Sequence, residues 1–187
     1  MIAPSGKLAT TLPRITPSHL QPRDQHFRSS LSRFATGVAV VTFDGRDGRH
    51  GMTVNSFTSV SMDPPLILVS VAKTTKSHDE LRGQPFTVNI LGAEQQELAR
   101  HFAGRSGAEP LWREGATAPR LDGVLAYFTC APWAEYNGGD HTLYVGEVVE
   151  FDYRLGDALA FINSQFTVIP AFILGATGLV PSPAASG

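Results

Sequence analysis

The sequence has a single cysteine in 187 residues, and that scarcity excludes two kinds of structure. Cys130 alone cannot form an intramolecular disulfide or a cysteine-rich metal site. It lies in the apolar run 124–130, so we expect it to pack in the core. This cysteine usage fits a reducing, cytoplasmic setting.

Long apolar runs and excess charge are also missing. No stretch is long enough to span a bilayer, and residues 1–24 lack the apolar block of a secretory signal. The formal net charge of −2 gives no electrostatic reason to expect nucleic acid or an anionic membrane as a partner. A Rossmann glycine fingerprint is absent too. We therefore expect a cytoplasmic protein with neither nucleic acid nor a membrane as its partner.

Proline, serine and threonine gather at both ends of the chain. We expect a flexible arm over 1–23, one folded domain over 24–174, and a flexible tail over 175–187. With 42% hydrophobic and 17% charged residues, the chain has enough apolar material to bury a core.

Most elements expected in the folded domain are strands. Strand-like composition marks 38–43, 66–72, 86–91, 124–136, 143–154 and 158–163, with a turn at 44–50 and a loop at 104–123. Three helices are expected. The first begins at Asp24 and is ended by Gly37. The second covers 77–83, with Ser77 as its N-cap and Glu80 three residues later, and the third covers 93–102. Many strands with few short helices predict an antiparallel barrel or sandwich rather than a doubly wound sheet.

The stretch GMTVNSFTSVSMDPP (51–65) has an unusual polar pattern. Six polar side chains fall within nine positions, at Thr53, Asn55, Ser56, Thr58, Ser59 and Ser61. A solvated edge strand is one interpretation. The apolar neighbours 38–43 and 66–72 favour a central position instead, where hydroxyl and amide groups suit a flat polar heterocycle and a phosphate. The spacing alone leaves both interpretations open.

Three stretches in order resemble the short-chain flavin reductase family. They are GMTVNSFTSVSMDPPLILVSV (51–71), FTVNIL with LARHFAGR (86–105), and GDH with GEV (139–148). The resemblance covers about 27–169 and implies an NAD(P)H-dependent reductase of FMN or FAD that serves a separate monooxygenase. It also implies a mainly β fold, a split β-barrel of the FMN-binding type (a Greek-key antiparallel barrel with a few short helices). A homodimer with flavin sites near the subunit interface, and no metal, are implied as well.

The resemblance places flavin contacts on several segments of the chain. The implied contacts are Thr53, Val54, Asn55, Ser56, Ser59, Val60, Ser61, Ser70, Ala72, Lys76, Ser77, Phe102, Ala103, Arg105, Gly139 and Phe166. Lys76 and Ser77 open the second expected helix, where a cation and helix N–H groups suit a phosphate. Arg105 suits flavin phosphate or the pyrophosphate of FAD. Without the resemblance, each of these residues has a structural interpretation. Lys76 would be a surface lysine, Arg105 a charge at the end of a helix, and Phe102 a core residue.

The GDH motif matches the family motif near the nicotinamide. His141 is expected to meet the carboxamide or a phosphate of NAD(P)H, and Asp140 to orient the loop or the imidazole. Both are positioning residues, because hydride transfer needs aligned rings rather than a protein nucleophile. A surface histidine is the alternative. For Glu147 we predict either a cation as its partner or a bulge in the strand near Gly146.

Residues 162–169 lack the basic residue that relatives carry there, although Phe166 keeps an aromatic side chain. No basic cluster marks a 2′-phosphate site, so NADH is expected rather than NADPH. FMN and FAD share the reacting ring and are not separated. Two alternatives remain, a non-enzymatic flavin carrier and a split-barrel oxidase that acts on its own substrate.

Overall fold

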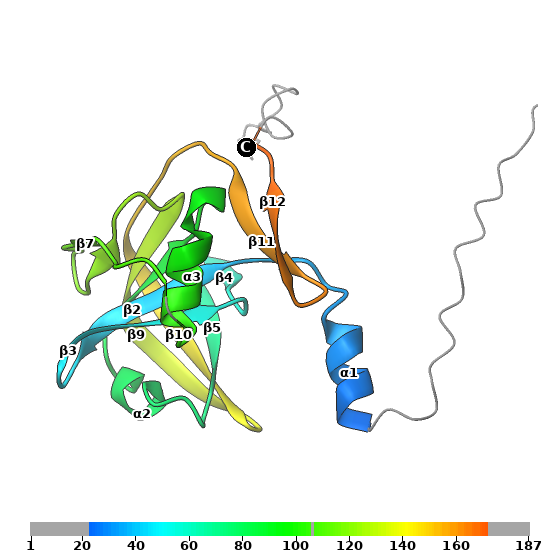
Figure 1. The fold of residues 1–187 in the computed structure, drawn as a ribbon. Helices are drawn as coiled ribbons and strands as arrows, with labels where there is room; N and C mark the ends of the chain where they lie inside the picture. Colours follow the sequence, from blue (N-terminus) through cyan, green and yellow to red (C-terminus); the bar gives the residue numbers. More distant parts are fainter. Residues whose placement is uncertain (1–22, 106, 172–187) are drawn as a thin grey trace, which may run out of the picture.

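The structure is a computed structural model that describes residues 23–105 and 107–171. The expected arm, except Arg23, and the whole expected tail lie outside the described residues. The described part is mainly antiparallel β-sheet (Figure 1), which confirms the mainly β prediction. No helix within it is long and apolar enough to cross a bilayer.

A seven-stranded antiparallel sheet forms the centre of the molecule, in the order β3-β2-β6-β9-β10-β5-β4. Its strands are β2 (Ala39–Gly45), β3 (Gly48–Val54), β4 (Thr58–Met62), β5 (Pro65–Ala72), β6 (Phe86–Ile90), β9 (Ala126–Gly138) and β10 (His141–Tyr153). A three-stranded sheet joins β1 (Thr36–Gly37), β11 (Ala158–Ile162) and β12 (Gln165–Ile169), and β7 (Trp112–Arg113) pairs with β8 (Arg120–Leu121). The expected strands are therefore present, and the loop 104–123 contains a short strand pair that was not expected.

The first helix differs from the prediction. Helix α1 (Arg23–Leu31) ends well before Gly37, which lies in β1 and pairs with Ala160. Pairing with β11 draws the backbone at residues 36–37 into an extended form. None of the helix residues is buried, and Phe27 is 63% exposed. Its apolar spacing therefore does not pack against the described part of this chain.

Helix α2 (His78–Leu81) begins after Ser77 as predicted, but Ser77 makes no side-chain capping bond. The His78 N–H donates instead to the Thr75 carbonyl at 3.0 Å. Glu80 does not reach back to complete a capping box. Its carboxylate accepts a bond from the Arg46 N–H at 3.3 Å, because the β2–β3 hairpin packs beside this helix. The third helical segment comprises η1 (Ala93–Gln95) and α3 (Gln96–Phe102), close to its predicted bounds.

The polar stretch 52–61 is not one strand in a central position, so that interpretation is wrong. It breaks after Val54 into β3 and β4, which are the two edge strands of the large sheet. The edge interpretation holds because sheet order depends on pairing between distant segments, which flanking composition does not report. The turn at 44–50 is also shorter than expected, since Gly45 already pairs with Gly48.

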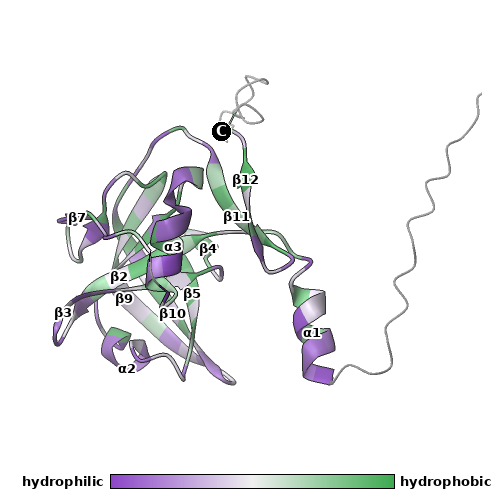
Figure 2. Cartoon of the chain, viewed as in Figure 1, coloured by the Kyte–Doolittle hydropathy of each residue, from purple (hydrophilic) through white to green (hydrophobic). Residues whose placement is uncertain are grey.

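Two hydrophobic clusters pack against strand β2, which is buried on both faces. Val41 and Phe43 belong to one cluster and Val40 to the other. Figure 2 shows hydrophobic residues concentrated in the sheet strands and hydrophilic ones on α2, α3 and the β2–β3 hairpin. Cys130 is buried in the first cluster, as predicted, and burial raises the pKa of its thiol to about 12. The predicted bulge beside Glu147 is confirmed by a register shift between Val145 and Gly146.

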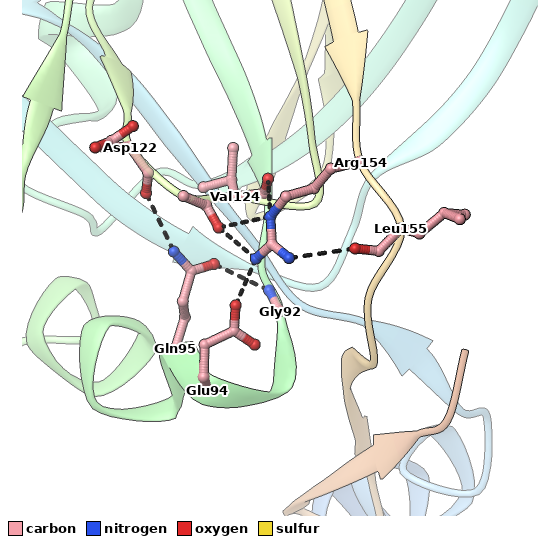
Figure 3. Close-up of polar contacts among 8 residues, drawn as sticks. Gly92, Glu94, Gln95, Asp122, Val124, Arg154 and Leu155 are labelled. Carbon is pink, nitrogen blue, oxygen red and sulfur yellow. Dashed lines mark hydrogen bonds and ion pairs between the residues drawn. The ribbon is translucent and has the colours of Figure 1, made fainter. Parts of the chain in front are cut away.

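Polar contacts fix the segments that carry α3. Arg154 follows β10 and donates to the Gly123 carbonyl at 2.6 Å and the Val124 carbonyl at 3.1 Å. It also pairs with Glu94 at 2.5 Å (Figure 3). Gln95 accepts from the Gly92 N–H at 2.9 Å and donates to the Asp122 carbonyl at 3.3 Å. These contacts tie η1 to the end of the loop 104–123 and so hold the start of α3.

Candidate functional site

Two adjoining cavities of about 590 Å³ each lie beside β3 and α3, one toward β5 and the other toward β11 and β12. Four residues line both cavities: Thr53, Val54, Asn55 and Ala103. Because they share this wall, the two cavities form one candidate site. We call them the β5 cavity and the β12 cavity after the strands that line them.

The β5 cavity brings together residues that are distant in sequence. Predicted residues along it, besides the shared four, are Ser56, Ser70, Ala72, Lys76, Ser77, Phe102 and His141. Ser56 donates its hydroxyl proton to the Ser70 carbonyl at 2.9 Å and accepts from the Ser70 N–H at 3.0 Å. Thr53 donates to the Ala99 carbonyl at 2.7 Å, which ties β3 to α3. The cavity wall is therefore held by bonds between its own segments.

The β12 cavity contains two predicted residues beyond the shared wall, Arg105 and Phe166. Sequence reasoning did not assign Val38, Gln96, Arg100, Phe161, Ser164 and Gln165 to it. Arg100 lies in the quoted LARHFAGR stretch, so its spacing from Arg105 was an available signal. The rings of Phe161 and Phe166 pack edge to face, with their centroids 5.4 Å apart, because the β11–β12 hairpin pairs these two residues. That hairpin was not predicted, and the cavity depends on it.

Five predicted residues do not line either cavity within the described chain. Ser59, Val60 and Ser61 lie on the edge strand β4, where Val60 is 49% exposed. Gly139 and Asp140 form the β9–β10 turn directly before His141. Gly139 has a φ of +79°, a backbone conformation that glycine adopts without steric cost.

His141 is the first residue of β10 and pairs with Gly138 on one side and Ala72 on the other. Its Nδ1 lies 2.7 Å from a carboxylate oxygen of Asp140. A hydrogen bond from His141, together with its charge, holds the pKa of Asp140 below its usual range. With Nδ1 in this contact, Nε2 is the ring nitrogen left to meet a ligand in the β5 cavity. The sequence interpretation that Asp140 orients the imidazole is consistent with this geometry.

The chemistry of the lining suits a flavin nucleotide. Uncharged hydroxyl and amide groups contribute to the shared wall and the β5 cavity, and the cations Lys76 and Arg105 line the β5 cavity and the β12 cavity, respectively. Such a set binds a flat polar heterocycle without a buried charge and offers cations to phosphate. Gly51 lets the Phe102 ring approach closely, since a Cβ there would lie 2.4 Å from it. Among residues 23–105 and 107–171, no group of three or more His, Cys, Asp or Glu residues could hold a metal ion.

Fold and cavities together define a mainly antiparallel β protein with two adjoining cavities whose lining suits a nucleotide with a flat ring. The sequence places it more closely. The family model for the flavin reductase like domain matches residues 31–170, and the chain belongs to that family.

Known relatives agree with this membership. The chain is 40% identical over 163 residues to an NADH-dependent flavin reductase of Rhodococcus sp, covering 82% of this chain and 87% of the relative. It is 39% identical over 127 residues to the reductase component of 4-hydroxyphenylacetate 3-monooxygenase from Thermus thermophilus, covering 67% and 83%. Among solved structures, the NADH:FAD oxidoreductase SgcE6 of Streptomyces globisporus, in complex with NAD and FAD fragments, has a TM-score of 0.71 and 35% identity, covering 78% and 92%.

Proposed function

We propose that this protein is an NADH-dependent flavin reductase that reduces FMN or FAD and supplies the reduced flavin to a separate monooxygenase. The observation that carries the proposal is the shared wall Thr53–Asn55, at which a cavity of about 590 Å³ that includes His141 meets a second cavity that includes Arg105. Relatives that bear the names of NADH-dependent flavin reductases and of monooxygenase reductase components support it.

Bound flavin supplies a ring that accepts hydride from the nicotinamide of NADH. The residues of this chain hold the two rings at reacting distance, which replaces a bimolecular encounter with an oriented one. Residues 53–56 with Ser70 and Ala72 orient the flavin ring, and Lys76 and Ser77 bind its phosphate. Phe102 and Ala103 exclude water from the wall that both cavities share.

His141 orients the nicotinamide nucleotide through Nε2, while Asp140 holds Nδ1 and so fixes the plane of the imidazole. Gly139 gives the turn the left-handed conformation that brings this pair to the cavity edge. A flavin carrier has no need of such a pair, so the His141–Asp140 contact favours a reductase. In the β12 cavity, Arg105 and Phe166 bind the remainder of a nucleotide through charge and an aromatic surface.

The assembly and fold details are also part of the proposal. We propose a split β-barrel over residues 24–174, supported by the Ser56–Ser70 contact that links the end of β3 to β5. A cytoplasmic homodimer completes it. In that dimer, Ser59, Val60 and Ser61 on the exposed edge of β4 complete a flavin site near the subunit interface.

The test is NADH oxidation by the purified protein with and without added FMN or FAD. We expect turnover to require added flavin and to fall in Asn55→Ala, because the exposed amide of Asn55 lines both cavities. NADH oxidation that proceeds equally without added flavin would contradict the proposal, as would retained flavin that turns over only with an organic substrate.

A further inference from the structure

Lys73 follows β5 and holds the turn that carries the GDH motif. Its Nζ donates to Asn137 Oδ1 at 2.6 Å and to the Gly139 carbonyl at 2.6 Å. Its backbone N–H donates to the Asp140 carbonyl at 2.9 Å. One residue thus contacts both positions of the β9–β10 turn and Asn137 near the end of β9, although it lines neither cavity.

The other side of His141 is fixed in a different way. Thr142 follows His141 and is 6% exposed, and its hydroxyl lies 2.8 Å from Nε2 of His78, which is 5% exposed. A buried contact of this kind opens only when α2 separates from β10. The strand after His141 is therefore held by a buried contact, whereas the turn before it is held by the contacts of Lys73.

The turn has little packing of its own. A Cβ placed at Gly139 would meet no described atom within 4 Å, and the Asp140 side chain is 91% exposed. The two Lys73 bonds are charge-assisted and short, which makes them stronger than bonds between neutral groups. Lys73 forms no salt bridge with the described residues, so no carboxylate competes with the turn for its ammonium group.

We propose that Lys73 is a positioning residue for His141. It holds the β9–β10 turn against the end of β5, and this keeps the imidazole directed at the β5 cavity. The proposal rests on the proposed function in that His141 orients the nicotinamide nucleotide. Loss of the Lys73 ammonium group therefore weakens the use of NADH and leaves the flavin contacts on β3 and β5 in place.

The experiment compares Lys73→Met, Lys73→Arg and Arg82→Met in the full chain. Methionine keeps much of the lysine length without its charge. Arg82 is a matched control, because it is an exposed cation that pairs with Glu135 of β9 at 3.4 Å, away from the turn. We expect Lys73→Met to lower kcat/KM for NADH by about tenfold, since small misplacements of a positioning group are costly. Lys73→Arg should restore at least part of that loss, and Arg82→Met should stay within about twofold of wild type.

Two further measurements decide between positioning and general destabilisation. Flavin affinity, measured by fluorescence titration without NADH, should change by less than about twofold in Lys73→Met. In the His141→Ala background, Lys73→Met should add almost nothing, because its effect passes through the missing ring. A full additional loss in that background, or an equal loss of flavin affinity, would overturn the proposal.

Amide hydrogen exchange of ligand-free protein separates this proposal from the proposed function. Faster exchange at residues 137–141 in Lys73→Met, with exchange in β6 unchanged, is expected even if the wild-type protein reduces no flavin. Unchanged exchange in the turn would overturn the role of Lys73 whatever the enzyme activity is.

Discussion

Ser56 and Ser70 share two hydrogen bonds through a single hydroxyl, which accepts from the Ser70 N–H and donates to the Ser70 carbonyl. Ser56 lies just beyond β3, an edge strand of the large sheet, and Ser70 lies on β5, beside the opposite edge strand. The β4 ladder along β5 reaches Leu68, so Ser70 has no strand partner on that side. The Ser56 hydroxyl takes the place of that partner and closes the wall of the β5 cavity.

Ser56→Ala should lower both stability and flavin affinity. The substitution leaves the partly buried N–H and carbonyl of Ser70 without their partner, at a cost of about 1–3 kcal/mol. Thermal melting and a flavin titration measure the two effects. Thr58→Ala is the matched control, because its exposed hydroxyl lies on β4 outside both cavities, and it should stay within about 0.5 kcal/mol of wild type. Equal effects of the two variants would contradict a closing role for Ser56.

His141→Ala should raise KM for NADH or lower kcat/KM while flavin affinity changes little. A positioning role of this kind is worth on the order of 1–3 kcal/mol of transition-state stabilisation. Asp140→Asn should have a smaller effect in the same direction, because the amide still orients the ring but lacks the charge. Steady-state kinetics with varied NADH at saturating flavin, beside a melting curve, tests this. A variant that loses stability but keeps its NADH kinetics would show that the GDH motif has only a structural role.

Asn89→Ala should destabilise the fold without changing the site directly. Fully buried Asn89 donates to the Val40 carbonyl at 3.0 Å and accepts from the Leu121 N–H at 2.8 Å. Removing the amide leaves the Leu121 N–H without its partner in the core, whereas the Val40 carbonyl keeps its place in the β2–β6 ladder, and we expect a loss of about 1–3 kcal/mol. Denaturant unfolding measures it, and exchange should quicken at residues 118–121 first. A loss below about 1 kcal/mol would show that water replaces these bonds.

Alkaline pH should destabilise the protein through Cys130. Burial raises the pKa of this thiol from its ordinary value of 9.0 to about 12 in the native state. Between these values the unfolded chain binds fewer protons than the native one, so the free energy of unfolding falls as pH rises. Denaturant unfolding across that range should show this slope, and Cys130→Ala should lose the part that belongs to the thiol. A thiol reagent should modify Cys130 in unfolded but not in native protein at pH 8, and rapid native labelling would contradict its burial.

Local sequence determined much of the secondary structure. The runs 38–43, 66–72 and 86–91 form buried strands, and the apolar composition of each run is enough to predict this. The bulge beside Glu147 could also be predicted, because a charged residue interrupts an apolar run there. The burial of Cys130 could be predicted because the cysteine lies within an apolar run. The family resemblance rested on three short motifs and needed no structure.

Tertiary pairing decided what local sequence could not. Strand order places β3 and β4 at opposite edges, although the stretch 52–61 is continuous in sequence. In the three-stranded sheet, pairing with β11 keeps Gly37 out of α1 and places Gln165 in one cavity with Arg100, whereas Ser59 on β4 lies outside both cavities. The hydrogen bond from Lys73 to the Gly139 carbonyl joins residues 66 positions apart, and the sequence around neither residue predicts it. Composition and spacing report a segment's own preference, whereas its neighbours across the sheet depend on how the whole chain packs.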